Sequence, residues 1–314
     1  MPEYSPDRLP APGSLCHEHH PMNDPIETDT PNDLPSDAPL PPGLYIVATP
    51  IGNLGDLSPR AASILSRVET IAVEDSRVTA KLLHRIGVKR AMTPYHDHNA
   101  DKVRPGLIAR MATQAVALVS DAGTPLISDP GYKLVRDARA AGIAVTTIPG
   151  PCAAVAALTL AGLPTDRFFF LGFLPAKEKA REDAITEVAT VRATLILYES
   201  GPRLGATLKA LAQGLGERDA AVVREISKTF EEAVTAPLAD LAARYADVAP
   251  KGEIVVIVGP PGPRPVATAD DADALLRAAL EHLPVGRAAG EVAKTTGLNR
   301  RELYARAMAI KDSD

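Results

Sequence analysis

The run from Val116 to Gly131, VALVSDAGTPLISDPG, is the segment that most constrains the fold of this chain. Its apolar beginning predicts a buried strand, and a helix is expected over residues 131–141 after the polar loop. In an open α/β sheet, ligands bind outside the carboxyl ends of the strands, where such loops lie. The run therefore predicts an α/β fold with a ligand site at Asp121. The Asp121 carboxylate, beside small residues that let a ligand approach the backbone, suits a ribose- or amine-bearing cofactor better than a bare phosphate.

Three further segments share this design, in which a strand is followed by small or charged residues. They are Leu44–Asp56, Thr70–Arg77 and Val145–Ala154. Since the carboxyl ends of parallel strands meet at one edge of a sheet, we expect these segments to surround one site. No G-x-G-x-x-G motif follows a strand, which disfavours a nicotinamide-dependent oxidoreductase.

The alternation of strands and helices predicts two α/β domains. The first, residues 43–165, has strands near 44–49, 70–73, 116–120 and 145–148, separated by helices, and its sheet should be mostly parallel. The second, residues 166–260, has strands near 167–172, 193–198, 220–226, 231–235 and 252–258. Its sheet should be mixed, because 220–226 and 231–235 are too close for a helical crossover.

A small helical segment is expected at the C-terminus, over residues 266–314. Helices near 268–282, 286–296 and 300–310 would form a helix-turn-helix-like extension. We expect its core to contain Val292, Leu298, Leu303 and Met308, with Arg300, Arg301 and Arg306 exposed. A plain helical hairpin and an RNA-contacting module are equally compatible with this pattern.

The N-terminal residues 1–42 contain eleven prolines and eight acidic residues against one arginine, so we predict a disordered acidic tail. The net charge of the whole chain is −5, and that of the remainder is +2, so any RNA recognition must be local. Cys16–His20 could bind a metal, but chance histidines in a polar tail are favoured and no metal is expected. No apolar run could cross a membrane and no secretory signal is visible, which indicates a cytoplasmic protein.

Four motifs carry a resemblance to a known family: Ala48–Asp56, Val73–Arg77, Tyr95–Asn99 and Ser120–Gly131. Over roughly residues 43–260 the chain resembles the tetrapyrrole methylase superfamily. The resemblance implies that S-adenosylmethionine binds in a cleft between two α/β domains. The motifs are most similar to the branch that methylates a cytidine ribose 2′-hydroxyl in the decoding centre of 16S ribosomal RNA. They imply the small ribosomal subunit as partner and a homodimer.

The resemblance also implies roles for individual residues. The residues expected to bind the cofactor are Pro50, Ser120, Asp121, Ala122, Gly123, Thr124, Ser128, Cys152 and Ala153. Those expected to act in catalysis are Glu74, Asp75, Arg77 and Glu199. A ribose hydroxyl has a high pKa, so a general base or a stabilising cation would help. For Asp75 and Arg77 an ion pair that fixes the loop, with Ser76 capping the helix, is an equal alternative.

RNA contacts are predicted for a third set of residues: Asn53, Asp56, Lys81, His96, Arg203, Lys228, Arg300 and Arg301. The family usually has proline and histidine where this chain has Gly201 and Pro202, so a role for that histidine is absent here. Two rival functions remain open, namely C-methylation of a tetrapyrrole and non-catalytic binding to the ribosome.

Overall fold

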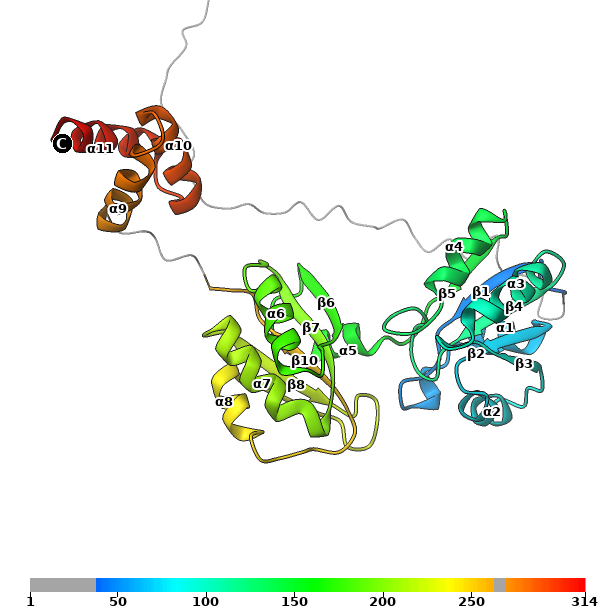
Figure 1. Ribbon diagram of the computed structural model, residues 1–314. Coiled ribbons are helices and arrows are strands. Elements are labelled where there is room, and N and C mark those ends of the chain that lie inside the picture. The colour runs from blue at the N-terminus through cyan, green and yellow to red at the C-terminus, as the bar shows by residue number, and fades with distance from the viewer. Residues whose placement is uncertain (1–37, 263–268, 314) are drawn as a thin grey trace, which may run out of the picture. The chain divides into compact units, whose positions relative to one another are not determined.

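The computed structural model describes residues 38–262 and 269–313, and within them a first sheet of five strands is entirely parallel (Figure 1). Its spatial order is β3-β2-β4-β1-β5. The strands are β1 (Gly43–Val47), β2 (Thr70–Val73), β3 (Ala91–Pro94), β4 (Ala115–Val119) and β5 (Val145–Ile148). The central strands are apolar on both sides, as expected of a parallel sheet covered by helices. The predicted parallel sheet is confirmed.

Helices cover both faces of this sheet. On one face α1 (Pro59–Arg67) and α2 (Ser76–Arg85) enclose a core with the strands, and on the other α3 (Ala100–Met111) and α4 (Tyr132–Ala140) enclose a second core. The chain leaves β1 toward the first face and β4 toward the second. The neighbouring carboxyl ends of β1 and β4 therefore form the point at which ligands bind in open α/β sheets.

The edge strand β3 is missing from the sequence prediction. Its four residues, AMTP, are exposed or half-buried and include a proline, so they carry neither an apolar run nor a clear alternation. Pairing with β2 gives this segment its extended form. A proline is tolerated there because an edge strand has one side without a neighbour.

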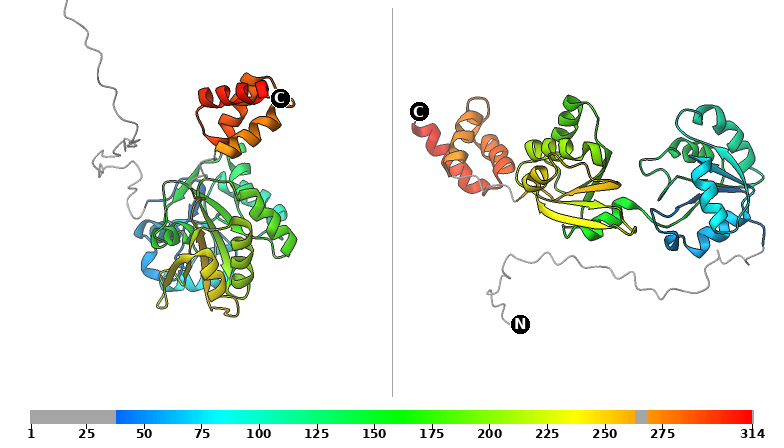
Figure 2. Two further views of the ribbon diagram at one scale, coloured as in Figure 1. Left: turned by 90° about the vertical axis from the view of Figure 1, so that its left-hand side faces the viewer. Right: turned by 90° about the horizontal axis from the view of Figure 1, so that it is seen from below.

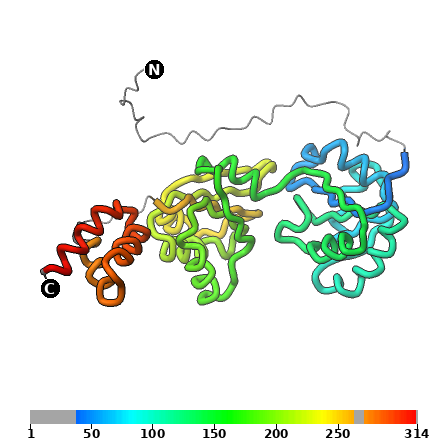
Figure 3. Tube along the Cα trace, turned by 90° about the horizontal axis from the view of Figure 1, so that it is seen from above, coloured from blue at the N-terminus to red at the C-terminus, as the bar shows by residue number. Residues whose placement is uncertain are grey.

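The second sheet is mixed, as predicted, with the order β6-β7-β10-β8-β9. Its strands are β6 (Phe168–Phe173), β7 (Thr194–Ser200), β8 (Asp219–Arg224), β9 (Glu232–Pro237) and β10 (Glu253–Val258). Only β6 and β7 pair in parallel; the other neighbours are antiparallel. The trace in Figure 3 shows the path of the chain through both sheets.

One face of the second sheet carries three helices and the other carries one. The helices α6 (Glu178–Val188), α7 (Gly201–Leu215) and α8 (Leu238–Arg244) share a core with one face of the sheet. On the other face α5 (Ala153–Leu160) packs against Ile196, Val223 and Ile257. The helix that directly follows the first sheet in sequence therefore packs against the second sheet.

Three C-terminal helices form a core of their own (Figure 2). They are α9 (Ala269–Leu280), α10 (Val285–Thr296) and α11 (Arg300–Ser313). The predicted core residues Val292, Leu298 and Leu303 are in it, but Met308 is 39% exposed, because Ala307 takes the inward position on α11. The Arg306 side chain is 40% exposed, and its guanidinium forms an ion pair with Asp273 at 2.8 Å.

Residues 1–37 of the predicted disordered tail, including Cys16–His20, lie outside the described residues, as does most of the proline-rich link before α9. The tail prediction is wrong at its end, because Leu40 is buried in the core beside α1 and the carbonyl of Pro41 accepts a hydrogen bond from the Tyr45 hydroxyl. No helix in the described part of the chain is long and apolar enough to cross a membrane.

Two neighbouring leucines on α9 test the C-terminal core. Leu276 is fully buried, whereas Leu275 is 40% exposed. We expect Leu276→Ala to destabilise the helices by about 2–5 kcal/mol, because it removes buried side-chain contacts and leaves a cavity. Leu275→Ala should cost less than about 1 kcal/mol. Hydrogen exchange of the α9–α11 amides in the full chain measures the loss of stability in each variant. Equal protection of these amides in the two variants would contradict the assigned packing.

Candidate active site

The loop that follows β4 is tied to the end of β1. Thr49 and Gly123 exchange backbone hydrogen bonds of 2.9 and 3.0 Å, which form an isolated antiparallel bridge. The loop has an unusual backbone, with φ near +75° at Leu126 and +63° at Ser128. A left-handed conformation is uncommon for such residues and occurs often at functional sites, where surrounding contacts maintain it. The sequence feature that predicts a ligand site thus folds into a fixed loop at the junction of β1 and β4.

The carboxylates of Glu74 and Asp121 meet at the ends of β2 and β4. The Asp121 side chain accepts a hydrogen bond from the backbone NH of Asp75 at 3.0 Å. The Glu74 side chain in turn accepts one from the backbone NH of Asp121 at 3.4 Å. These reciprocal bonds hold the two strand ends together and fix both carboxyl groups at the sheet edge.

A third carboxylate, Asp129, belongs to the same group. Burial and the neighbouring Glu74 raise its pKa to about 6. Burial also raises the pKa of Glu74 and of Asp121. Beyond burial, the charge of Asp121 raises the pKa of both Glu74 and Asp129. A cationic ligand placed among these carboxylates would relieve that repulsion.

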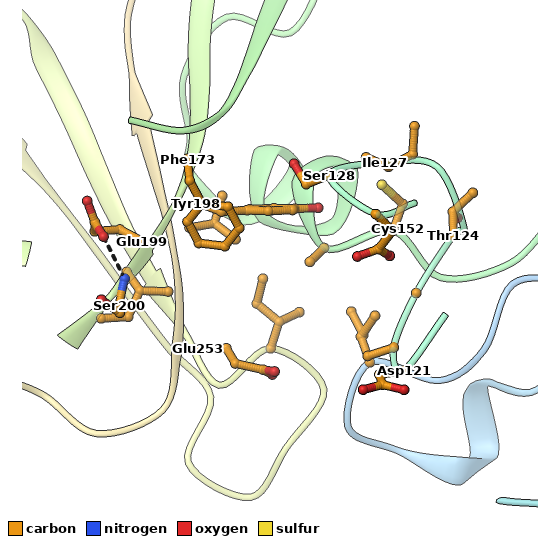
Figure 4. A pocket seen from close by; sticks show the side chains of 18 of the residues that line it. Asp121, Thr124, Ile127, Ser128, Cys152, Phe173, Tyr198, Glu199, Ser200 and Glu253 are labelled. Atoms are coloured by element: carbon orange, nitrogen blue, oxygen red, sulfur yellow. Dashed lines mark hydrogen bonds between the residues drawn. The ribbon is translucent and has the colours of Figure 1, made fainter. Parts of the chain in front are cut away.

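Glu74, Asp121 and Asp129 line a cavity of about 390 Å³, whose other wall comes from the second sheet. Figure 4 shows Asp121, Thr124 and Cys152 on one side, with Phe173 and Tyr198 opposite. The Tyr198 ring makes edge contacts with Phe170 and Phe173, at centroid distances of 5.0 and 5.6 Å. The second sheet therefore contributes an aromatic cluster to the cavity, together with the acidic side chains of Glu199 and Glu253.

The Tyr198 hydroxyl connects the cavity to the start of α5. It accepts a hydrogen bond from the backbone NH of Ala154 at 3.2 Å. Burial raises the pKa of Tyr198, so its hydroxyl stays protonated at neutral pH. The hydroxyl proton can be donated within the cavity while the oxygen holds the helix start in place.

Glu199 lines the cavity but is fully engaged with its own surroundings. Its buried carboxylate accepts hydrogen bonds from the Thr207 hydroxyl at 2.6 Å and from the Ser200 backbone NH at 2.9 Å (Figure 4). Arg203 lies 3.3 Å away and donates to the carbonyl of Leu174. The arrangement stabilises the junction of β7 and α7, and the expectation that Glu199 acts in catalysis stays a prediction.

The predicted catalytic pair Asp75 and Arg77 lies outside the cavity lining. Asp75 is the N-cap of α2, so the predicted capping by Ser76 is wrong. Its carboxylate pairs with the Arg77 guanidinium at 2.6 Å, and this pairing lowers the pKa of Asp75 to about 2. The Arg77 side chain is 86% exposed. The contacts match the alternative in which this ion pair fixes the loop.

Most of the residues predicted to bind the cofactor line the cavity. They are Asp121, Ala122, Gly123, Thr124, Ser128, Cys152 and Ala153. Ser120 lies beneath the loop, where its buried hydroxyl bonds to loop carbonyls such as that of Ala122 at 3.3 Å. Pro50 lines a separate groove beside α2 that also includes Asp121.

The residues predicted to contact RNA fall outside the cavity lining. Asn53 caps the short helix η1 (Leu54–Asp56), and Asp56 accepts a hydrogen bond from the Ser227 hydroxyl. Lys228 bridges Glu225 and Glu253 at 2.9 and 2.8 Å. Lys81 lines the groove beside α2, and His96 is half-buried with no hydrogen-bond partner for Nδ1. On α11, Arg300 and Arg301 are both exposed.

Sequence reasoning missed several residues that line the cavity, among them Asp129, Phe173, Tyr198 and Glu253. Asp129 lies inside a motif that was singled out, and Tyr198 directly precedes Glu199. Position within these segments could have indicated them. Phe173 and Glu253 carry no such signal, because the packing of the second sheet brings them to the cavity.

The cavity fits S-adenosylmethionine in size and charge. Ligand pockets for molecules of this size measure about 300–1,000 Å³. Three carboxylates match the positively charged sulfur and ammonium group of the cofactor, and the apolar wall at Phe173 and Ile226 offers a surface for a base. Backbone groups at Ala122–Thr124 are accessible because Gly123 carries no side chain.

Comparison with known proteins identifies the family. The model for the tetrapyrrole (corrin/porphyrin) methylases matches residues 43–242, and the model for the RsmI C-terminal HTH domain matches residues 266–311. The chain belongs to the tetrapyrrole methylase family. It is an S-adenosylmethionine-dependent methyltransferase, as the family resemblance implied.

Relatives within this family match nearly their whole length. Ribosomal RNA small subunit methyltransferase I of Erythrobacter litoralis is 54% identical over 275 residues, which cover 87% of this chain and 97% of the relative. The protein of the same description from Mesorhizobium japonicum is 50% identical, covering 88% and 94%. That of Escherichia coli O157:H7 is 46% identical, covering 83% and 93%. The chain belongs to this branch of the family.

Solved structures agree with the fold. Diphthine synthase superposes with a TM-score of 0.54 at 14% identity, covering 69% of this chain and 89% of that one. The methyltransferase CobJ superposes with a TM-score of 0.54 at 19% identity, covering 71% and 96%. At this level of identity the likeness establishes the fold alone.

Removing the Asp121 carboxylate tests the cofactor site. We expect Asp121→Ala to weaken S-adenosylmethionine binding on the order of tenfold, because it removes an anion from the cavity and the bond that joins two strand ends. Calorimetric titration measures the affinity, with Asp166→Ala on the surface as control. Unchanged affinity in a folded Asp121→Ala protein would remove this residue from the site.

The raised pKa of Asp129 makes cofactor affinity depend on pH. Above about pH 6 its carboxylate is charged and attracts the cation; as pH falls through 6 it gains a proton and the attraction is lost. Affinity should therefore fall between pH 7.5 and 5.5. Asp129→Asn should bind more weakly at pH 7.5 and lose most of this pH dependence. If affinity depends on pH equally in the wild type and in Asp129→Asn, Asp129 does not face the cofactor.

Proposed function

We propose that this methyltransferase modifies a cytidine ribose 2′-oxygen in 16S ribosomal RNA of the small ribosomal subunit. The observation that carries the proposal is the 54% identity, over 275 residues, with a ribosomal RNA small subunit methyltransferase I. The match to the C-terminal HTH model supports it, because it extends the similarity beyond the two sheets.

The cavity chemistry agrees with transfer to an oxygen. S-adenosylmethionine supplies an electrophilic methyl group on a positively charged sulfur. Forming the new bond to a ribose oxygen requires loss of the hydroxyl proton, and a carboxylate with a raised pKa accepts a proton better than an ordinary one. Glu74 and Asp129 are cavity residues of this kind. We assign proton acceptance to this pair rather than to Asp75, whose pKa is lowered by Arg77.

The charge of the cavity disfavours the rival tetrapyrrole substrate. Among the described residues that line the cavity, none is a lysine or arginine, and five are acidic: Glu74, Asp121, Asp129, Glu199 and Glu253. A macrocycle with several carboxylates would be repelled there, because like charges in a partly buried site interact strongly. An RNA presents a neutral ribose and base to the cavity while its phosphates stay outside.

RNA recognition would then depend on local basic surfaces. The chain has no tryptophan, which disfavours a stacking platform for single strands. On the C-terminal helices, Arg287, Lys294 and Arg300 line an open groove in which Glu291 is the one acidic residue. We propose that this groove contacts the folded RNA, and that the enzyme acts in the cytoplasm as a homodimer.

Methyl transfer to the ribosome tests the proposal directly. Purified enzyme and labelled S-adenosylmethionine would be incubated with small subunits from cells that lack this enzyme. We expect label on a single nucleotide, which after digestion is a 2′-O-methylated cytidine. Label on another base or none on the subunits, with cofactor still bound, would contradict the proposal.

Charge reversal on α11 tests the C-terminal groove. Arg300→Glu with Arg301→Glu should weaken binding to small subunits on the order of tenfold or more, because two cations become anions near phosphate. Cofactor affinity should not change, which provides the control for folding. If subunit binding is unaffected, the C-terminal helices do not contact RNA through these residues.

A further inference from the structure

Four basic residues lie along one face of α2. Arg77, Lys81, His84 and Arg85 occur at intervals of four, three and one, which places them within one side of a helix. All four are exposed, and the helix contains no acidic residue. The opposite side carries Leu83, which is buried in the core below the first sheet. We call these four residues the basic face of α2.

A groove runs between this face and the loop after β1. Lys81, His84 and Arg85 line it on one side, and Pro50, Gly52 and Leu54 belong to the other, around a volume of about 450 Å³. Asp121 lines both the groove and the cofactor cavity. The groove therefore lies directly beside the site of methyl transfer.

Among the described residues, no carboxylate is in direct contact with the basic side chains of the groove, although the charge of Lys81 adds to the larger effect of Arg77 in lowering the pKa of Asp75. Within the described part of the chain, no ion pair includes Lys81, His84 or Arg85. By contrast, Lys228 on the far side of the same loop is held by two carboxylates. Of the described residues that line the groove, Asp121 alone is acidic, and it also lines the cavity.

The geometry suits a phosphate backbone. The basic face extends over nine residues, a length of about 12 Å at the rise of a helix, and its basic side chains repeat on successive turns. Long flexible cations on such a surface contact phosphates and fix the position of a nucleic acid without reading its sequence. The acidic cavity next to the groove repels phosphate, so a bound strand would keep its backbone on α2 and direct a nucleoside toward Asp121.

We propose that the basic face of α2 binds the sugar-phosphate backbone of the substrate RNA beside the nucleotide that is methylated. This inference rests on the proposed function and extends it to a surface that positions the substrate. It assigns Lys81 and Arg85 to substrate binding and leaves the methyl-transfer chemistry to the residues of the cavity.

The test is the double variant Lys81→Gln with Arg85→Gln in the full-length protein. Its matched control is Lys133→Gln with Arg139→Gln, which removes the same two charges from exposed positions of α4 on the opposite face of the first sheet. Three quantities would be compared: KM and kcat on small subunits, affinity for protein-free 16S RNA transcribed in vitro, and affinity for S-adenosylmethionine.

We expect the α2 variant to raise KM on the order of tenfold with little change in kcat, and to weaken binding to the transcript similarly. The slope of log affinity against log salt should become shallower by about 1.4, since each lost phosphate contact contributes about 0.7. Cofactor affinity should stay at the wild-type value. The control variant should match the wild type in all three quantities.

Several results would overturn the inference. One is a variant whose RNA affinity and salt slope equal those of the control, which would leave the basic face merely solvated. Another is normal binding to the transcript with impaired turnover of subunits, which would indicate an acidic protein surface as the partner. A third is loss of cofactor affinity, which would place the groove in the cofactor site.

Failure of the proposed function is a separate outcome. Wild-type enzyme that labels no cytidine in small subunits would contradict the proposed function, while transcript binding would still test α2. If the wild type binds the transcript and the α2 variant does not, the inference holds without the assigned acceptor. If the wild type binds no RNA at all, both are wrong.

Discussion

The backbone bridge between Thr49 and Gly123 is the constraint on which the site depends. Those two hydrogen bonds join the end of β1 to the loop after β4, at the place where the chain turns toward opposite faces of the sheet. With the loop held there, Asp121 can reach the backbone of Asp75 and bring the end of β2 into the same group. Three strand ends thus form one side of the cavity because a single loop is fixed by its backbone.

The first sheet and its helices separate charges of opposite sign over a short distance. Inside the cavity, burial raises the pKa of Glu74, Asp121 and Asp129, and the charge of Asp121 adds to this effect at Glu74 and Asp129. Outside, α2 exposes Lys81 and Arg85, neither of which forms an ion pair within the part of the chain that the structure describes. A cationic cofactor and an anionic RNA therefore meet surfaces of opposite sign to their own. The boundary between these surfaces lies at Asp121, which both share.

The sequence predicted those features that depend on local patterns. The apolar strands β1, β2, β4 and β5, the loop around Asp121 and the parallel arrangement follow from alternation of strands and helices. The edge strand β3 does not, since its extended form comes from pairing with β2 rather than from its own residues. Met308 was predicted to lie in the core of the three C-terminal helices, but its neighbour Ala307 takes that place, because it is small enough to lie at their centre.

Much of the site was predictable from motifs, and the rest came from tertiary packing. Seven of the predicted cofactor residues line the cavity, since they follow strands directly. Asp75 has a residue type that serves catalysis and helix capping equally well, and only its contacts with α2 and Arg77 distinguish the two uses. Phe173 and Tyr198 come from another sheet, so their place at the cavity depends on how α5 packs against β7.

Protection of Cys152 from alkylation is the most direct test of the central claim, that the cavity between these strand ends holds the cofactor. This free thiol lines the cavity and is partly exposed. Its modification rate would be measured by mass spectrometry with increasing S-adenosylhomocysteine, and Cys16 in the N-terminal tail would provide the reference rate. We expect Cys152 to become protected with the same midpoint as cofactor binding, while Cys16 reacts unchanged. An unaltered rate at Cys152 with the cofactor bound would place the cofactor elsewhere.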